Sequence, residues 1–313
     1  MTTKSTREAA MQAIQELARQ DEKIVIISPD AVAAARATKF REEFPDRVIE
    51  VGIAEQDAVD IAAGLATTGM KPVVVSYAGF LTMRACEMIR TFVAYPGLNV
   101  KLIGLNGGML GGEREGVTHQ FYEDVGIMRS MPGVKIICPA DAQQAYLAAK
   151  AMMEVDGPVY LRLGSGREPE VFPEGTPFEF GKIREVKSYG NDVAIFATGF
   201  IMNRAIEALE QLHNEGVNGV LVDVSTIKPL DSAGVADVLR RTNCAVAVED
   251  HNFYGGMSSA ICEVACHFHP SKVRRLGLRD VYPRSGKAAE LLDAYGLSVQ
   301  DIVDAAKDAM VKE

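Results

Sequence analysis

The residue whose type and position most suggest chemistry is Glu55, in the segment Val51–Asp57 between two apolar stretches. Residues 47–53 are rich in β-branched side chains and predict a strand, and residues 58–66 are rich in alanine and predict a helix. Glu55 therefore follows the carboxyl end of a strand, where open α/β sheets place ligands. A lone glutamate at this position is also typical of an ordinary helix, whose first turn favours an acid.

Two further segments place reactive or aromatic groups at the same kind of strand end. Phe80 opens a helix predicted over residues 80–94, and the glycine-rich loop 106–112 follows the next predicted strand. After this loop, the run Glu113–Gln120 carries two acids, an arginine and a histidine. Because parallel strands end at the same edge of a sheet, we expect these groups to lie in one region with Glu55.

The elements that must position these residues alternate between short apolar runs and longer helical patterns, which is typical of a parallel sheet covered on both faces. Between Glu168 and Phe178, three prolines and a glycine predict a linker. The alternation then starts again. We predict an α/β fold with two doubly wound domains, residues 1–170 and 191–313, joined by a linker and entry hairpin at 171–190.

The composition limits the function classes. The 313 residues are 48% apolar and 24% charged, which suits a globular protein with a sizeable core. A net charge of -9, without a run of basic residues, argues against nucleic acid or an anionic membrane as the main partner. The sequence has neither the apolar core of a secretory signal nor a membrane-length apolar run, so we expect a cytoplasmic protein. The five scattered cysteines fit reduced thiols, and we predict no metal ligands in this chain.

Three motifs together resemble the pyrimidine-binding half of the transketolase family: Gly-Ile-Ala-Glu-Gln at 52–56, Phe80-Leu81 at a helix start, and Gly-Val-Thr-His-Gln at 116–120. The likeness continues at 223–231 and 248–257, which resemble that family's C-terminal domain. The resemblance implies a thiamine-diphosphate-binding, pyrimidine-type fold followed by a transketolase C-terminal-type domain. It also implies a transferase of carbohydrate metabolism, as in the pentose phosphate reactions, that moves a two-carbon ketol unit from a ketose phosphate to an aldose phosphate.

The resemblance assigns four residues to the cofactor. Glu55 would hydrogen-bond the ring nitrogen of the aminopyrimidine and favour the imino form, which removes the C2 proton of the thiazolium ring. Phe80 would pack against the pyrimidine face, although an ordinary core aromatic fits the sequence nearly as well. Ile53 and Gln56 flank the glutamate in the same motif and are expected at the cofactor too.

The resemblance also assigns residues to the substrate. His119 would contact the hydroxyls of the donor sugar and help to move protons, and Gln120 follows it in the same motif. Glu115 stands where the family usually has Asp, which shifts the carboxylate by roughly one C–C bond, about 1.5 Å.

Two positions concern a substrate phosphate. Arg162 resembles a family arginine that binds this group, a task suited to its bidentate fork, and we expect it at the edge of the pocket. Asn106 and Gly107 stand where long transketolases have a phosphate-binding histidine. Either the phosphate is held differently here or the substrate is unusual.

A complete transketolase also has an N-terminal half, whose Gly-Asp-Gly motif and downstream Asn hold Mg²⁺ and the diphosphate. The sequence contains no Gly-Asp-Gly. We therefore predict a separate N-terminal subunit that holds the metal and diphosphate, with the cofactor at the interface of an α₂β₂ heterotetramer.

Two alternatives stay open at this point. The β subunit of a 2-oxoacid dehydrogenase component shares the glutamate motif and the two-domain plan, although Thr118-His119-Gln120 favours a transketolase. A non-catalytic binding or regulatory half is the other alternative, and the presence of Glu55, Phe80 and His119 argues against it.

Overall fold

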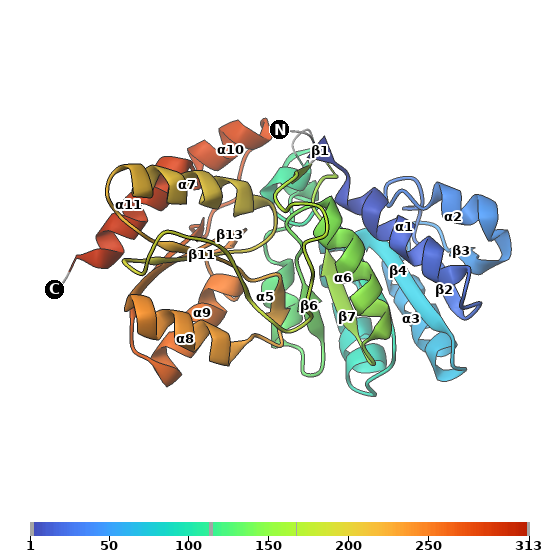
Figure 1. Cartoon of the computed structure of the whole chain (residues 1–313). Coiled ribbons are helices and arrows are strands. Elements are labelled where there is room, and N and C mark those ends of the chain that lie inside the picture. Colours follow the sequence, from blue (N-terminus) through green and yellow to red (C-terminus); the bar gives the residue numbers. More distant parts are fainter. Residues whose placement is uncertain (1–2, 113–114, 167, 312–313) are drawn as a thin grey trace.

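Runs of β-branched residues form the buried central strands of two sheets, one in each half of the molecule (Figure 1). The computed structural model describes residues 3–112, 115–166 and 168–311. The first sheet has seven strands in the order β12-β6-β7-β5-β4-β2-β3, and the second has five in the order β14-β13-β10-β11-β9. All pairs are parallel except β12 with β6 and β9 with β11. The predicted α/β class with two parallel-dominated sheets is confirmed.

The first sheet consists of β2 (Ile24–Ser28), β3 (Val48–Glu50), β4 (Lys71–Tyr77), β5 (Lys101–Leu105), β6 (Lys135–Ile137), β7 (Val159–Arg162) and β12 (Thr226–Lys228). Its α-helices are α1 (Thr6–Ala18), α2 (Thr38–Glu43), α3 (Glu55–Thr67), α5 (Asp124–Ser130) and α6 (Ala142–Glu154). Short 3₁₀ segments occur at η1 (Pro45–Arg47), η4 (Met109–Gly112) and η5 (Gly116–His119). Two short strands, β1 (Thr3–Lys4) and β8 (Glu168–Pro169), pair separately.

The second sheet consists of β9 (Arg184–Ser188), β10 (Ala194–Ala197), β11 (Val220–Asp223), β13 (Cys244–Asn252) and β14 (Lys272–Leu278). Its helices are η6 (Gly199–Ile201), α7 (Met202–Asn214), α8 (Ser232–Thr242), α9 (Met257–Phe268), α10 (Ala288–Ala294) and α11 (Val299–Met310). In the part of the chain that the structure describes, no helix is long and apolar enough to cross a membrane.

The segment after β4 differs from its prediction. The sequence pattern predicts one regular helix over residues 80–94. The structure instead has two π-helical segments, η2 (Phe80–Arg84) and η3 (Ile89–Ala94), with a short α4 (Cys86–Met88) between them. A π-helical turn contains about one residue more than an α-helical turn and is frequent at functional sites. It therefore changes which side chains point toward the carboxyl end of β4.

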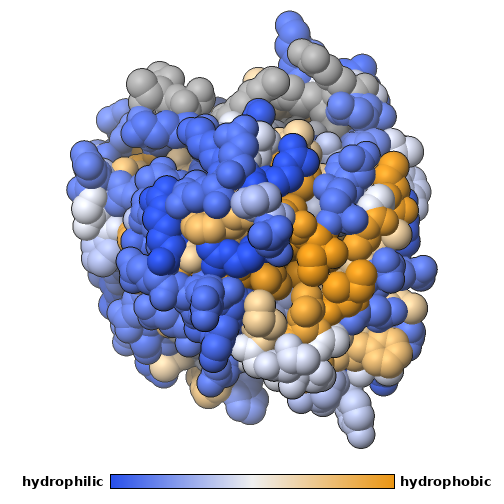
Figure 2. Space-filling view, turned by 90° about the vertical axis from the view of Figure 1, so that its right-hand side faces the viewer, coloured by the Kyte–Doolittle hydropathy of each residue, from blue (hydrophilic) through white to orange (hydrophobic). Residues whose placement is uncertain are grey.

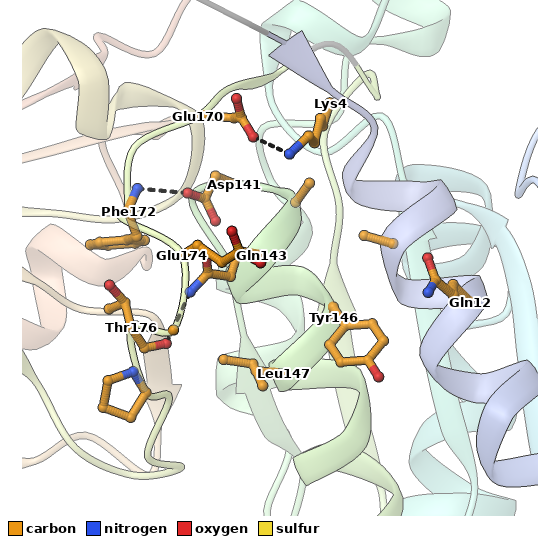
Figure 3. A pocket seen from close by; sticks show the side chains of 14 residues that line it. Lys4, Gln12, Asp141, Gln143, Tyr146, Leu147, Glu170, Phe172, Glu174 and Thr176 are labelled. Atoms are coloured by element: carbon orange, nitrogen blue, oxygen red, sulfur yellow. Dashed lines mark hydrogen bonds and ion pairs between the residues drawn. The ribbon is translucent and has the colours of Figure 1, made fainter.

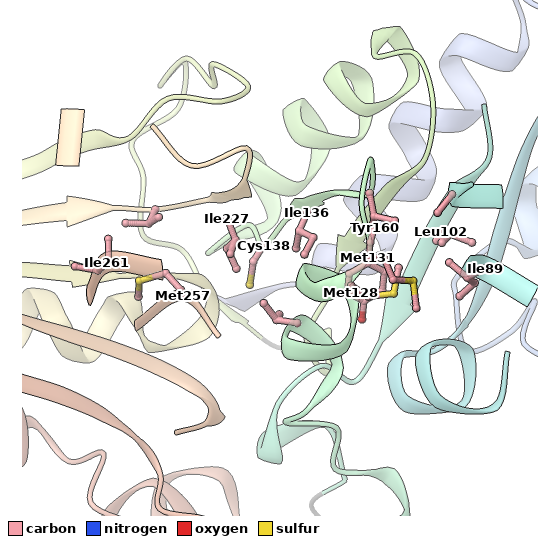
Figure 4. Close-up of a cluster of buried hydrophobic side chains, with 14 of the residues drawn as sticks. Ile89, Leu102, Met128, Met131, Ile136, Cys138, Tyr160, Ile227, Met257 and Ile261 are labelled. Atoms are coloured by element: carbon pink, nitrogen blue, oxygen red, sulfur yellow. The ribbon is translucent and has the colours of Figure 1, made fainter. Parts of the chain in front are cut away.

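The two halves are packed together more closely than the predicted linker suggests. Strand β12 comes from the second half of the chain and pairs with β6 in the first sheet. One hydrophobic cluster runs through both halves and includes Ile89, Tyr160, Ile227 and Ile261 (Figure 4). The domain limits stay a prediction, but this shared core packs the two halves of the chain against each other.

Candidate active site

Glu55 is placed by a tight turn between β3 and α3. The backbone of Gly52 has a φ of +73°, a left-handed value that glycine adopts readily, and α3 begins at Glu55 itself. The carboxylate lies under the surface, with the residue only 1% exposed. The strand-to-helix turn predicted from the sequence thus delivers a buried acid to the carboxyl end of the sheet.

Two side chains hydrogen-bond this carboxylate. Ser76, near the end of β4, donates from Oγ to Glu55 Oε1 at 3.4 Å, and Arg84, the last residue of η2, donates from Nη1 to Oε2 at 2.6 Å. The sequence interpretation missed both. Ser76 could have been found from its place at the end of the strand preceding Phe80, whereas Arg84 reaches Glu55 from the π-helical turn, which the sequence did not reveal.

An aromatic cluster is linked to the carboxylate through Arg84, whose guanidinium carbon lies 4.6 Å from the centre of the Phe80 ring. Tyr77 and Phe80 pack edge-to-face with ring centroids 5.7 Å apart, and His119 packs edge-to-face on both, at 5.5 and 5.3 Å. Phe121 closes the cluster at 5.2 Å from Phe80. Gly79 permits this packing, because a Cβ there would overlap the Phe121 ring. Tyr77 is a further residue that sequence reasoning missed, although it ends β4.

His119 is the histidine that the structure brings to Phe80. It lies at the end of η5, half-buried, and its Nδ1 is 3.0 Å from Thr118 Oγ1. The ring therefore has an orientation that is fixed by neighbouring aromatic rings and a hydroxyl group. The sequence expectation that Glu55, Phe80 and His119 lie in one region agrees with this geometry.

Other predicted site residues lie farther out or point elsewhere. Ile53 is 75% exposed, and the exposed Gln56 donates from Nε2 to the Arg84 backbone carbonyl at 3.2 Å. Glu115 is exposed at the start of η5. Gln120 is buried and donates to the backbone carbonyl of Arg284, in the second half of the chain, at 3.2 Å.

The predicted position of Arg162 at the pocket edge is wrong. The side chain is buried and its Nε donates to Asp124 Oδ1 and Oδ2 at 3.1 and 2.8 Å, while Nη2 donates to the carbonyls of Phe121 and Asp250 at 3.2 and 3.0 Å. Burial opposes the guanidinium charge, but Asp124 together with Cys138 and Asp250 outweighs it and raises the pKa of Arg162 well above its usual value. Since Asp250 belongs to β13, these hydrogen bonds connect the two halves of the chain. They also occupy the guanidinium nitrogens that would otherwise bind a substrate phosphate.

The first two residues of the loop that begins at Asn106 also support the fold instead of facing a substrate. Asn106 is buried with a φ of +58°, and its side-chain oxygen accepts a hydrogen bond from Arg7. At Gly107 a Cβ would overlap the Arg162 side chain. These two residues therefore support the fold, and they do not replace a phosphate-binding histidine with an equivalent group.

A separate hollow of about 650 Å³ lies between α1, α6 and the residues after β8 (Figure 3). Its charged side chains include ones that are already paired: Lys4 pairs with Glu170 at 2.5 Å, and Asp141 Oδ2 accepts from the amides of Val171 and Phe172 at 3.0 and 2.8 Å. We therefore locate the candidate active site at Glu55.

Comparison with known proteins gives the family of the chain. Residues 2–167 match the transketolase pyrimidine-binding domain, and residues 181–302 match the transketolase C-terminal domain. The chain belongs to the transketolase family. It comprises a pyrimidine-binding domain and a C-terminal domain of that family.

Relatives of similar length occur in several organisms. The chain is 36% identical to a putative transketolase C-terminal section of Methanocaldococcus jannaschii, covering 99% of this chain and 98% of that protein. It is 35% identical to a 6-deoxy-6-sulfo-D-fructose transketolase subunit of a Clostridium species (96% and 93%) and 34% identical to an apulose-4-phosphate transketolase subunit of Phocaeicola vulgatus (98% and 97%). A solved structure titled as a split gene transketolase, inactive beta4 tetramer, superposes with a TM-score of 0.89 at 37% identity, covering 98% of each chain.

Transketolases generally depend on thiamine diphosphate, and the site fits one end of that cofactor. A buried carboxylate whose partner Arg84 also lies over the Phe80 ring suits an aminopyrimidine, which needs a proton partner and an aromatic contact. For a divalent cation, no group of three or more His, Cys, Asp or Glu side chains within the described ranges is placed to hold a metal ion.

Proposed function

We propose that this chain is the pyrimidine-binding subunit of a thiamine-diphosphate-dependent transketolase that moves a two-carbon ketol unit between a ketose phosphate and an aldose phosphate. The observation that carries the proposal is the buried Glu55 carboxylate, linked through Arg84 to the ring of Phe80, which packs in turn against Tyr77 and His119. It is supported by relatives whose names include transketolase subunits.

In this proposal each residue of the site has a distinct task. Glu55 holds and shares a proton with the ring nitrogen of the aminopyrimidine, and Tyr77 and Phe80 present aromatic surface to the ring. His119, fixed against both rings, binds a donor hydroxyl and transfers its proton. Thiamine diphosphate supplies the electron sink that allows the carbon–carbon bond next to the ketone to break.

The proposal requires a partner subunit that holds Mg²⁺ and the diphosphate. Seen from the end of the molecule formed by the first sheet, apolar residues gather on one side (Figure 2). Exposed apolar side chains of the first half of the chain include Ile53, Met83 and Phe92, and Phe92 lines an apolar hollow of about 450 Å³ between α3 and η3. Because Ile53 and Met83 adjoin the Glu55–Arg84 site in sequence, we propose that the partner covers this face and completes an α₂β₂ enzyme.

The site residues do not specify which group of this chain binds the anionic end of the substrate. With Arg162 and Asn106 built into the scaffold, the anionic end of the sugar has to be bound by other groups. The relatives' names mention a sulfonated sugar and a sugar phosphate, so both chemistries belong in a substrate screen.

The experiment is to purify the chain with the protein that binds it and to assay the complex with Mg²⁺ and thiamine diphosphate. Ketose phosphates and a sulfonated ketose serve as donors and an aldose phosphate as acceptor. We expect an aldose two carbons shorter than the donor, formed only when both chains are present. Turnover by the isolated chain would refute the need for a partner, and decarboxylation of 2-oxoacids without ketol transfer would refute the transketolase assignment.

A further inference from the structure

Arg84 occupies a position that the proposed cofactor also needs. Its Nη1 donates to Glu55 Oε2 at 2.6 Å, and its guanidinium carbon lies 4.6 Å from the centre of the Phe80 ring. The cation thus makes a hydrogen bond to the buried acid and a cation–π contact with the aromatic ring at the same time. Arginine favours both contacts, since its fork matches a carboxylate and its plane lies on aromatic faces.

A bound aminopyrimidine is another flat group that requires a Glu55 oxygen and an aromatic face. The second carboxylate oxygen, Oε1, already accepts from Ser76 at 3.4 Å inside the fold. Oε2 and the Phe80 face are therefore the groups open to a ligand, and Arg84 covers both. This argument rests on the proposed function, because that function is what places an aminopyrimidine here.

Electrostatics points in the same direction. A guanidinium 2.6 Å from the carboxylate stabilises the negative charge on Glu55, whereas the proposed chemistry requires Glu55 to share a proton with the cofactor ring. An ion pair that persisted during turnover would oppose this proton sharing. Arg84 and the cofactor ring are thus competing partners for one carboxylate.

The contacts around Arg84 allow its side chain to leave while its backbone stays in place. In the chain without its partner the side chain is 46% exposed, so water can replace its hydrogen bond with Glu55. The Arg84 carbonyl accepts from Gln56 Nε2 at 3.2 Å, which links the end of η2 to the first turn of α3. A rotation of the Arg84 side chain would therefore uncover Glu55 without moving the two helices.

We propose that Arg84 occupies the pyrimidine site of the unloaded protein as a mobile substitute for the cofactor ring, and that it swings out when thiamine diphosphate binds. In the unloaded chain Arg84 neutralises a buried acid. The cofactor then has to displace this contact, which lowers its affinity. Arg84 is accordingly a residue that controls cofactor loading and takes no part in the bond-breaking step.

The test is calorimetric titration of thiamine diphosphate, at fixed Mg²⁺, into the complex of the chain with its partner. We expect Arg84→Met to bind the cofactor about fivefold more tightly than the unaltered complex, because a partly exposed ion pair of this kind contributes at most about that factor. Arg84→Lys keeps the charge but loses the planar fork, and is expected to lie between the two. Arg41→Met, a change at an exposed arginine in α2, is the matched control and should leave the affinity unchanged.

A second readout uses the protein without substitution. With ¹⁵N-labelled arginine, the paired Arg84 guanidinium should give a slowly exchanging N–H signal in the unloaded complex that is lost when thiamine diphosphate is added. Unchanged or weaker binding by Arg84→Met, or a signal that persists in the loaded complex, would overturn the inference while leaving the proposed function intact. If the unaltered complex bound no thiamine diphosphate, both the proposed function and this inference would fall.

Discussion

The molecule contains two arginine–carboxylate pairs near the carboxyl ends of the first sheet, and they are built in opposite ways. Arg162 and Asp124 are both buried, and Arg162 also donates to carbonyls of both halves of the chain. Glu55 is equally buried, but its partner Arg84 is nearly half exposed and donates from one nitrogen. The first pair is enclosed by protein on all sides, whereas the second is open to solvent through its cation.

This difference separates scaffold from site. A buried guanidinium with several acceptors cannot leave without abandoning an uncompensated carboxylate, so Arg162 fixes how the two halves pack. An exposed guanidinium exchanges its contact for water at small cost, so Glu55 can change partners. The acid with a replaceable partner is the one suited to chemistry.

The largest expected effect is on the chemistry of Glu55. In the assembled complex, Glu55→Gln keeps the size of the side chain but removes the shared proton, and we expect exchange of the C2 proton of bound thiamine diphosphate to slow by about 10²–10⁴-fold. Proton exchange followed by NMR in deuterated buffer measures this rate.

Asp57→Asn is the matched control for this change, since Asp57 lies in the same helical turn but is exposed. It should exchange at the normal rate. A normal rate in Glu55→Gln would remove Glu55 from the mechanism and with it the distinction between the two pairs.

The sequence was sufficient to predict the pieces of the site that depend on strand ends. Glu55, Phe80 and His119 each follow or accompany a predicted strand end, and because parallel strands share one edge, their proximity followed from topology. The α/β class followed from the alternation of short apolar runs and helical patterns.

What the sequence could not reveal depends on local geometry. Arg84 reaches Glu55 because the turn after β4 is π-helical, and the chain pattern predicted an ordinary helix there. Arg162 looked like a phosphate ligand because it ends a strand, but its direction is set by Asp124 and by the carbonyl of Asp250, which are 38 and 88 residues away in the chain. Side-chain direction at a strand end is decided by such long-range partners, which single-sequence patterns do not show.

The next largest effect is expected for the buried pair of Arg162 and Asp124. Arg162→Met should lower the free energy of unfolding by about 3–5 kcal/mol, because it leaves the Asp124 carboxylate buried without a cation. Urea denaturation of the isolated chain measures this loss. Arg19→Met is the control: Arg19 pairs with Glu43 at 2.7 Å on the surface, and the change should cost about 1 kcal/mol or less. Equal stability of the two variants would mean that Arg162 does not hold the halves together.

The smallest effect on the free energy of unfolding is expected for the partly exposed pair of Arg84 and Glu55. Arg84→Met should change the free energy of unfolding by about 1 kcal/mol or less, because water takes the place of a guanidinium that already lies partly in solvent. The remaining difference between this variant and the unaltered chain should shrink as salt is added, since mobile ions screen a partly exposed pair. Urea denaturation at low and high salt measures both quantities. A loss as large as that of Arg162→Met, insensitive to salt, would show that Arg84 is fixed in place like Arg162, and an arginine fixed in that way could not give up Glu55 to a cofactor.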